Sequence, residues 1–387
     1  MKEVVNTPCF VIHKEILDDL VLELTEAVRG YWPRAIVGYS VKTNNLPWIL
    51  EYMKNKGIYA EVVSSDEYNM AKKIGYNSNR IIFNGPVKGE KEFKEAVKKE
   101  AIINIDSKRE LRWLTECKDI KAQIGLRVNF DLEAMCPGES QCGVEDSRFG
   151  FSYEAGEFSD ALEYITQNKI TLKGLHLHCS SKTRSLDIYL AIAEMAVKLV
   201  REFNLDLEYI DIGGGFFGGV IGKPTFKDYF SGVKHIFNEE PRLQKTNLIV
   251  EPGMAVIGAS IDYISKIIDV KKTKNNNFVT IDGSRIHIDP LMRKSGYDYD
   301  VNIGDNRNVV EKQTICGFTC MENDRLFVLN DSPAFKEGDS IVFKKVGAYT
   351  MGLSPLFIQL FPRVYVNDRN IIKLVRQKWT EEKFINY

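Results

Sequence analysis

Apolar and polar residues alternate in two different ways along the chain, and the change falls near residue 254. Between residues 35 and 253, short runs rich in Ile, Val and Leu are separated by longer stretches with the spacing of amphipathic helices. The predicted strands lie at 35–41, 59–63, 80–84, 101–105, 122–129, 172–179, 208–212 and 247–251. Helices are predicted between them at 45–56, 64–75, 88–99, 107–117, 153–168, 185–203 and 224–239. Eight alternating strands predict a (β/α)8 TIM-type barrel, because the competing doubly wound sheet usually has about five to seven.

Beyond residue 254 the pattern is that of a mostly antiparallel β domain. Segments rich in Ile, Val, Phe and Tyr, with turn-like residues between them, occur at 261–272, 277–283, 313–318, 325–330, 340–347 and 363–366. We therefore predict an α/β fold with a barrel domain over 31–255 and a β domain over 256–387. Two placements are open for the strand expected at 8–12: pairing with the barrel, or packing, with the rest of residues 1–30, on the C-terminal β domain.

Composition excludes several classes of protein. The net charge of −1 gives no reason to expect nucleic acid or an anionic membrane as a partner. No apolar run approaches the roughly 18 residues that span a bilayer, and the first residues lack the apolar core of a signal peptide. The seven cysteines are scattered, without a CxxC pair or the spacing of a zinc site. We expect a cytoplasmic protein with no disulfide framework and no metal.

The first predicted barrel strand runs into a lysine, in Ala35-Ile-Val-Gly-Tyr-Ser-Val-Lys42. A lysine at the carboxyl end of a barrel strand is poorly placed for packing and well placed for chemistry. Burial there would favour the uncharged amine, which is a nucleophile able to form a Schiff base. The alternative is a lysine that reaches solvent from the end of the strand.

Three later strand ends carry further candidate groups. Gly213, Gly214 and Gly215 follow the seventh strand, where backbone amides can approach a phosphate closely; a flexible loop is the alternative. The eighth strand ends in Glu251, whose carboxylate needs a cation or a protonated nitrogen at a barrel mouth. In the sixth strand His176 and His178 point to the same side, and we expect His176 to be a core residue and His178 a functional one. A lysine, a phosphate cradle, a carboxylate and an imidazole at one mouth predict a pyridoxal phosphate site.

The motifs, in their order along the chain, resemble those of fold type III pyridoxal phosphate enzymes of the diaminopimelate, ornithine and arginine decarboxylase group, which share an alanine racemase-like barrel. They are Tyr39-Ser-Val-Lys42-Thr-Asn44, Glu61-Val-Val-Ser64-Ser-Asp-Glu67, Ile82-Phe-Asn84-Gly85-Pro86-Val-Lys88, Ser147-Arg148-Phe149-Gly150, His178 with Ser181, Gly213 to Gly215, Glu251-Pro-Gly253, Gly317-Phe-Thr-Cys320-Met-Glu-Asn-Asp324 and Gly347-Ala-Tyr349-Thr350.

This resemblance implies roles for individual residues. Lys42 would carry the cofactor as a Schiff base, and Glu251 would pair with the pyridine nitrogen. His178 would stack on the ring, Ser181 and the three glycines would bind the phosphate, and Glu61 and Tyr349 would lie near the cofactor. The resemblance also implies a homodimer with shared active sites, in which Cys320 reaches the partner subunit's barrel and protonates the α-carbon after carbon dioxide is lost.

Three positions depart from the pattern of that group, and all concern the substrate. Met254 follows Glu251-Pro-Gly where the group usually has arginine. Met321 follows Cys320 where an acidic residue is usual, and Glu322 comes one place later, either as a substitute or as a surface residue. The segment from Asp282 to Pro290 lacks the usual arginine before its proline. In its place, Arg285 and His287 are candidates for binding an acidic distal group of the substrate, and Asp289 is a candidate for binding a basic one.

The expected function is therefore decarboxylation of an amino acid or an amino-acid-derived substrate through the electron sink of pyridoxal phosphate. An amino-acid racemase is the main alternative, and Glu251 argues against it because related racemases place an arginine at the pyridine nitrogen. A non-catalytic, regulatory pyridoxal phosphate-binding homologue is the second alternative. The retained Lys42, His178 and Cys320 argue against that one.

Overall fold

The computed structural model describes residues 5–143 and 145–386, and its Cα positions group into two compact units. One unit is Leu20–Ala255, and the other combines the residues up to Asp19 with those from Val256 onward. Within the described residues, no helix is long and apolar enough to cross a membrane.

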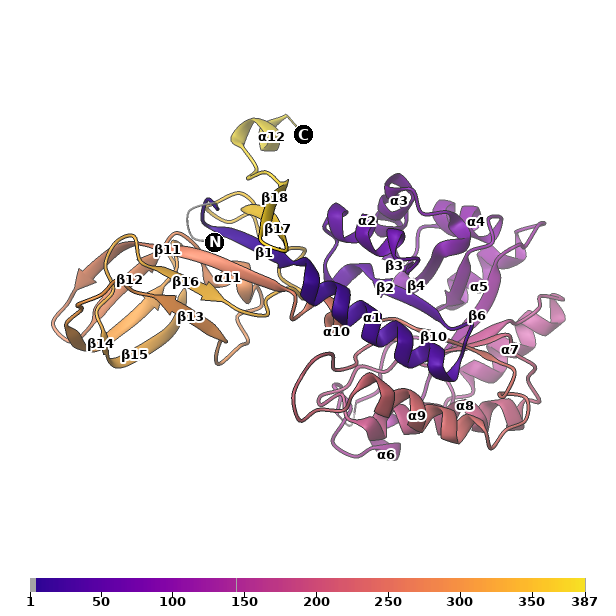
Figure 1. Ribbon diagram of the computed structural model, residues 1–387. Helices are drawn as coiled ribbons and strands as arrows, with labels where there is room; N and C mark the ends of the chain where they lie inside the picture. Colours follow the sequence, from indigo (N-terminus) through magenta and orange to yellow (C-terminus); the bar gives the residue numbers. More distant parts are fainter. Residues whose placement is uncertain (1–4, 144, 387) are drawn as a thin grey trace. The chain divides into compact units, whose positions relative to one another are not determined.

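The first unit is a closed barrel of eight parallel strands (Figure 1). Each strand pairs with the next, and pairings of β10 with β2 and of β5 with β6 complete the ring. This confirms the predicted TIM-type barrel. The strands are β2 (Ile36–Ser40), β3 (Tyr59–Ser64), β4 (Ile81–Val87), β5 (Ile102–Ile105), β6 (Gln123–Asn129), β8 (Gly174–His176), β9 (Tyr209–Asp211) and β10 (Asn247–Val250), and the two-residue strand β7 (Phe151–Ser152) adds to β6.

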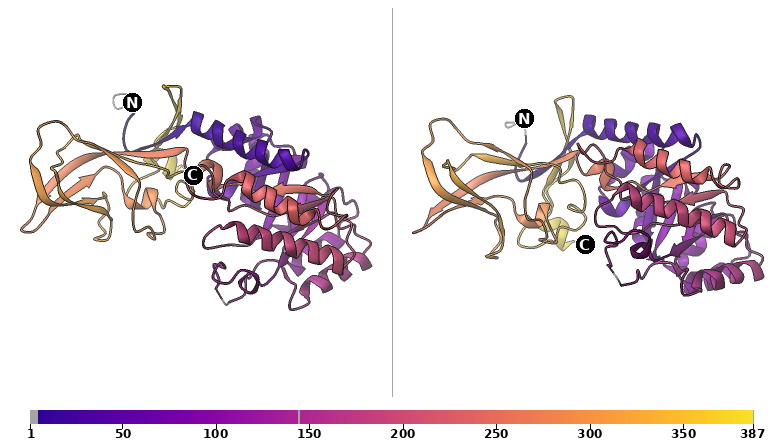
Figure 2. Two further views of the ribbon diagram at one scale, coloured as in Figure 1. Left: turned by 60° about the horizontal axis from the view of Figure 1, so that its bottom comes forward. Right: turned by 90° about the horizontal axis from the view of Figure 1, so that it is seen from below.

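Amphipathic helices surround this barrel, and several begin at capping residues that the sequence supplies. Ser64 and Ser107 each accept a hydrogen bond from a backbone N–H in the first turn, and Thr225 forms a reciprocal capping box with Asp228. Figure 2 shows α8 and α9 side by side. The helices are α1 (Lys14–Tyr31), α2 (Pro47–Asn55), α3 (Ser65–Ile74), α4 (Glu90–Val97), α5 (Lys108–Thr115), α6 (Leu132–Met135), α7 (Glu157–Gln167), α8 (Leu186–Glu202), α9 (Phe226–Phe237) and α10 (Met254–Ile257).

A fully buried ion pair ties the carboxyl ends of β4 and β5 together. The Lys88 ammonium donates to the Glu110 carboxylate at 2.8 Å, to the Gly85 carbonyl at 2.8 Å and to the Asn104 carbonyl at 3.0 Å. Both charged side chains are 0% exposed. Because a buried charge is tolerated only when it is paired and hydrogen-bonded, this arrangement fixes the two strand ends against each other.

The second unit is built on a mostly antiparallel sheet, as predicted, with strand order β15-β14-β12-β11-β1-β17-β18 and with β16 pairing to β11 and β13. The parallel exceptions are β1 with β17 and β12 with β14. The opening strand lies in this sheet, between β11 and β17, and not in the barrel. The elements are β1 (Cys9–His13), β11 (Ile261–Lys272), β12 (Asn277–Ile281), β13 (Tyr299–Asn302), β14 (Val309–Cys316), β15 (Arg325–Pro333), β16 (Ser340–Phe343), β17 (Arg363–Asp368), β18 (Ile371–Arg376), α11 (Arg285–Ile288) and α12 (Glu381–Ile385).

Candidate active site

Lys42 lies directly beyond β2, in a short 3-10 turn over Val41–Thr43. Its amine is 3.5 Å from the carboxylate of Glu61, which is 1% exposed and ends in the barrel interior. Ser40 Oγ donates to the same Glu61 oxygen at 2.6 Å, and Asn84 Nδ2 donates to the other oxygen at 3.1 Å. The Lys42 side chain is itself 42% exposed, so the burial expected from the sequence is incomplete. The turn after β2 lifts the amine above the strand end, where an incoming molecule can reach it.

A second buried carboxylate, Glu251, follows β10 and is held from two sides. Asn84 donates a short hydrogen bond to Glu251 Oε1, and the side chain of Asp211 is also hydrogen-bonded to Glu251. Burial, reinforced by the Glu251 carboxylate, raises the pKa of Asp211 well above its usual range. Two carboxyl groups can share a hydrogen bond only when one of them is protonated, and the raised pKa makes Asp211 the one that takes up a proton more readily. The Glu251 carboxylate is therefore held in a fixed position by Asn84 and Asp211.

Two imidazole rings lie next to this carboxylate with their planes almost parallel. The His176 and His178 centroids are 6.2 Å apart at an interplanar angle of 8°, so both point to the same side, as the alternation predicted. Strand β8 ends at His176, shorter than predicted, and His178 lies beyond it where the chain leaves the barrel. Burial lowers the pKa of His178 to about 3, with Arg127 adding to the effect. His178 is therefore a neutral ring, and its Nδ1 has no hydrogen-bond partner among the described residues.

The glycines after β9 are required by close packing, which explains why no larger residue occupies them. A Cβ atom at Gly213 would collide with the His178 ring, and one at Gly214 would collide with the Glu251 carbonyl. Gly213 and Gly215 also have φ values of +70° and +95°, which favour glycine. The Gly213 N–H donates to Asp211 Oδ1 at 2.9 Å. The three glycines thus form a bare backbone surface against His178 and Glu251.

A cavity of about 410 Å³ opens beside His178 and is lined by residues 128–133 and by much of the loop that follows β6. That loop is anchored to the segment after β8, because Ser140 forms a β-bridge with Ser181 and Gln141 donates to the Ser181 carbonyl at 3.0 Å. Ser181 therefore stands at the junction of two loops at the carboxyl ends of the strands. The cavity has room for a small substrate beside the imidazole ring.

The comparisons with known proteins decide the family. Residues 19–258 match the family model described as pyridoxal-dependent decarboxylase, pyridoxal binding domain. Residues 254–347 match the model of the C-terminal sheet domain of the same decarboxylases. The chain belongs to this family. Its members are carboxy-lyases that depend on pyridoxal phosphate.

Relatives of the decarboxylase are similar over almost its whole length. A diaminopimelate decarboxylase of Aquifex aeolicus is 27% identical over 96% of this chain and 89% of that protein. The crystal structure of diaminopimelate decarboxylase from M. jannaschi has a TM-score of 0.86 at 23% identity, covering 99% of this chain and 92% of that one. The arginine decarboxylase of Paramecium bursaria Chlorella virus, solved with agmatine, has a TM-score of 0.74 at 22% identity over 91% and 94% of the two chains. The two structural matches show the shared fold.

The residues of the barrel unit fit pyridoxal phosphate. The cofactor needs an amine for its aldehyde, a carboxylate for its pyridine nitrogen and a backbone cradle for its phosphate. Lys42 has an amine, Glu251 a carboxylate and the glycines at 213–215 an uncovered backbone, at the carboxyl ends of β2, β10 and β9. His178, whose Nδ1 has no hydrogen-bond partner among the described residues, lies against Gly213. Glu251 is the group that distinguishes this set from a generic phosphate site.

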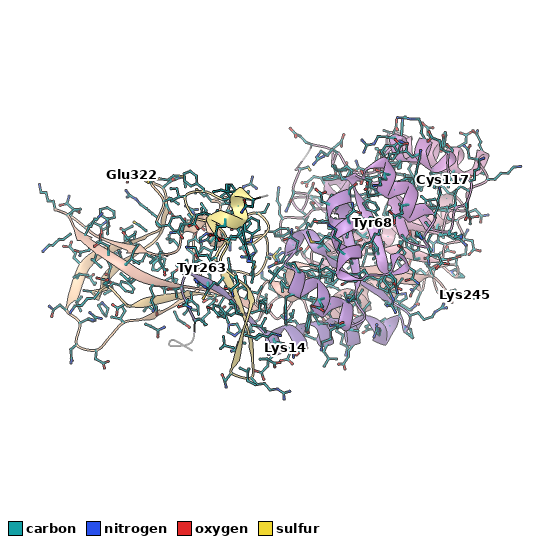
Figure 3. All side chains as sticks on the ribbon, turned by 90° about the horizontal axis from the view of Figure 1, so that it is seen from above. Lys14, Tyr68, Cys117, Lys245, Tyr263 and Glu322 are labelled. Carbon is teal, nitrogen blue, oxygen red and sulfur yellow. The ribbon has the colours of Figure 1, made fainter. Side chains whose placement is uncertain are left out.

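The remaining predicted residues belong to the second unit. Cys320 and Glu322 lie in a turn between β14 and β15; placing Glu322 on the opposite face of a strand from the residue before it, as strand alternation suggests, is therefore wrong. Asp324 shapes this turn: its carboxylate accepts from Thr319 and from Ser284, and its carbonyl accepts from the Gly317 N–H. Cys320 is exposed, and the Glu322 side chain is 95% exposed and points outward from the molecule (Figure 3).

Three candidates for substrate binding sit in or beside α11 with structural partners of their own. The Asp289 carboxylate is 4% exposed and accepts from the Arg285 guanidinium at 3.0 Å, from two backbone N–H groups and from Tyr297. His287 is buried, its Nδ1 is 2.5 Å from the Tyr263 hydroxyl, and burial lowers its pKa to about 4. Asp289 and His287 therefore hold the local fold of this segment.

Tyr349, also in the second unit, is 39% exposed and has a φ of +55°.

Sequence reasoning missed the polar residues that orient Glu61 and Glu251. Asn84, Asn104 and Asp211 form a chain of hydrogen bonds, because Asn104 Nδ2 donates to Asn84 Oδ1 at 2.9 Å and to Asp211 Oδ2 at 3.2 Å. Each sits in or at the end of a strand that is otherwise apolar, in Ile-Phe-Asn, Ile-Ile-Asn and Tyr-Ile-Asp. A polar residue inside a run of buried apolar ones was the signal that would have found them.

A further carboxyl group near Lys42 and Glu61 makes stability depend on pH. Glu67 accepts from the Val63 N–H at 2.8 Å, and burial raises its pKa from 4.5 to about 7, with Glu61 adding to the shift. The folded chain therefore binds this proton more tightly than the unfolded chain. The contribution of Glu67 to stability is therefore greatest below about pH 4.5 and is lost as the pH rises through about 7.

We expect Glu67→Gln to flatten this dependence by on the order of 2 kcal/mol between pH 5 and pH 8, with the variant the more stable protein at pH 8. Urea unfolding at the two pH values measures the effect. Asp66→Asn, an exposed neighbour on the same helix turn, is the matched control. An equal pH slope in wild type and Glu67→Gln contradicts the assignment.

Proposed function

We propose that the chain removes the α-carboxylate of a diamino acid of the diaminopimelate class, with pyridoxal phosphate bound at the mouth of the barrel. The observation that carries the proposal is the buried Glu251 carboxylate at the end of β10, held in place by hydrogen bonds with Asn84 and Asp211. A carboxylate held there keeps a pyridine nitrogen protonated, which strengthens the ring as an electron sink. Loss of carbon dioxide leaves negative charge on the α-carbon, and the electron sink is what stabilises that charge.

Each barrel residue then has one task toward the cofactor. Lys42 provides the amine that takes the aldehyde, and Glu61 lies close enough to receive or return protons at that amine. The neutral imidazole of His178 would stack on the cofactor ring. In the glycine loop of Gly213, Gly214 and Gly215, the Gly213 N–H is held by Asp211 Oδ1, Gly214 and Gly215 offer backbone N–H groups to the phosphate, and Ser181 adds a hydroxyl. When bound, the cofactor supplies the electron sink that stabilises the carbanion left after carbon dioxide departs.

The α-carbon must then be protonated, and Cys320 is the donor that we assign. Its thiol is exposed in the turn between β14 and β15, where it can approach another protein surface. We assign it to the barrel of a second copy of the chain, which makes the active enzyme a homodimer. Tyr349 belongs to the same unit and is assigned to the same shared site.

For the distal group of the substrate, Glu322 is the best of the four candidates from the sequence. Asp289 and Arg285 satisfy each other, and His287 is enclosed beside Tyr263. Glu322 keeps its carboxylate 95% exposed next to Cys320, although Arg325 contacts it at 2.7 Å. A carboxylate at that position suits a substrate with a distal cation, such as the amine of diaminopimelate, lysine or ornithine or the guanidinium of arginine.

The test combines cofactor binding with release of carbon dioxide. The purified, reconstituted protein should show the visible absorbance of bound pyridoxal phosphate. It should release carbon dioxide from one member of a panel of meso-diaminopimelate, lysine, ornithine, arginine, carboxynorspermidine and acidic amino acids. We expect meso-diaminopimelate to be the best substrate, and Glu322→Gln to raise its KM with little change in kcat. Exchange of the α-hydrogen without carbon dioxide release would overturn the proposal and favour a racemase.

A further inference from the structure

Arg184 brings a positive charge to the glycine loop from a part of the chain that the proposed site has not used. It lies in the segment after β8 and is half-buried. Its guanidinium carbon is 4.5 Å from the centroid of the Phe217 ring, and its Nη1 is 3.5 Å from the Met254 sulfur. Phe217 comes two residues after Gly215, and Met254 directly follows Gly253. Arg184 thus touches the residues that flank both of the loops beyond β9 and β10.

Among the described residues, 5–143 and 145–386, no carboxylate lies within ion-pair distance of the Arg184 guanidinium. The polar contact of its side chain is to a thioether, which is a weak acceptor. By contrast, Arg127 in β6 is paired with Asp106 at 2.9 Å. A partly buried cation without an anion is unfavourable unless a ligand supplies the anion. The unpaired guanidinium therefore marks a position for an oxyanion.

The backbone of Arg184 is held in a strained conformation by contacts that lead to the glycine loop. Its φ is +58°, a value that non-glycine residues rarely adopt. The Tyr229 hydroxyl donates to the Arg184 carbonyl at 2.6 Å, and the Tyr229 ring packs on Tyr189 with centroids 4.7 Å apart. Tyr189 in turn donates to the Gly214 carbonyl at 2.9 Å. The two tyrosines couple the position of Arg184 to that of the loop.

The charge around the loop explains why a cation is needed there. Backbone N–H groups orient a phosphate but carry no net charge, and the nearby Glu251 carboxylate repels it. The residue after Gly253 is the neutral Met254. We propose that Arg184, reaching over from the loop after β8, binds the phosphate of pyridoxal phosphate and supplies the charge that residue 254 does not. The inference rests on the cofactor placement in the proposed function, and the main readout of its test is cofactor affinity, which does not require turnover.

The experiment measures dissociation constants of the apoprotein for pyridoxal phosphate and for pyridoxal, which lacks the phosphate, by tryptophan fluorescence. We expect Arg184→Ala to weaken pyridoxal phosphate binding by about 10- to 100-fold, as for loss of one charge-assisted contact, and to leave pyridoxal binding unchanged. Equal weakening of both ligands would indicate a structural role and overturn the proposal. Unchanged binding of both, with a raised substrate KM, would also overturn it and assign Arg184 to the substrate carboxylate.

Two further variants sharpen the test. The double variant Arg184→Ala with Met254→Arg should recover pyridoxal phosphate affinity to within about threefold of wild type. Residue 254 contacts Arg184 in the wild type, so an arginine at 254 can place its guanidinium in the space that the removed side chain occupied. Lys223→Ala is the matched control, since Lys223 is the other cation over Phe217, with Nζ 5.4 Å from the ring centroid. A loss of affinity in Lys223→Ala as large as in Arg184→Ala, or no recovery in the double variant, would count against the assignment. If Arg184→Ala selectively weakens pyridoxal phosphate binding but the wild type releases no carbon dioxide, the proposed function is overturned and the assignment of Arg184 stands.

Discussion

Replacing Lys42 by alanine is expected to remove the visible absorbance of bound pyridoxal phosphate and to lower kcat by on the order of 10³-fold or more. Lys42 is the amine that the turn after β2 presents beside Glu61, and 42% of its side chain is exposed to an incoming ligand. Without it, the aldehyde has no attachment point in the barrel. Absorbance spectra of the reconstituted variant and single-turnover carbon dioxide release measure the two effects.

Lys56→Ala, at the end of the helix that follows Lys42, is the control and should leave both readouts as in wild type. Added methylamine should restore part of the activity of Lys42→Ala, since a free amine can replace the missing one. A Lys42→Ala protein that keeps the band and more than a tenth of the rate would show that another lysine holds the cofactor.

The second large effect concerns stability. Lys88→Met should lower the free energy of unfolding by about 3–5 kcal/mol, because it leaves the Glu110 carboxylate buried without its cation. The two side chains are 0% exposed, and the Lys88 amine also satisfies two backbone carbonyls, of Gly85 and Asn104. Urea unfolding followed by circular dichroism gives the difference.

Lys72→Met removes a half-exposed pair with Glu95 and serves as the control, with an expected change below about 1 kcal/mol. The double variant Lys88→Met with Glu110→Leu should recover much of the lost stability, because no uncompensated charge remains. If Lys88→Met costs no more than the Lys72 control, the ion pair does not hold the strand ends as described.

The barrel could be predicted from the sequence because each of its strands is a short apolar run between amphipathic helices, and all eight predicted strands are present. The strands of the β unit were harder to predict from the sequence. The strand at Tyr299–Asn302 is short and half polar, with two exposed residues, so its pattern resembles a loop. The edge strand at Ile371–Arg376 carries no buried residue in the described structure, and no core face marked it. Pairing partners far apart in sequence, such as β1 with β17, leave no local signal.

For the candidate site, the sequence showed the groups at strand ends but not the residues that orient them. Lys42 and Glu251 stand out because a charged residue ends an apolar run. The sequence did not indicate a role for Asp211, because that role is its hydrogen bond to Glu251, which is distant in sequence and close in the barrel. The substrate-facing role considered for Asp289 could not be weighed from the sequence, since Arg285 and Tyr297 satisfy it only in the folded segment. Individual residue roles stay predictions until the variants are measured.

The position of β1 has a consequence for synthesis on the ribosome. Cys9–His13 pairs with strands that begin at Ile261 and Arg363, so the first strand emerges long before either of its neighbours. At about 5–20 residues per second, the interval before the second neighbour appears is on the order of tens of seconds. The barrel strands are all translated within that interval. We therefore expect the barrel to assemble first on the nascent chain. The apolar residues of β1 stay exposed, and accessible to chaperones, until β11 and β17 have been synthesised and pair with them.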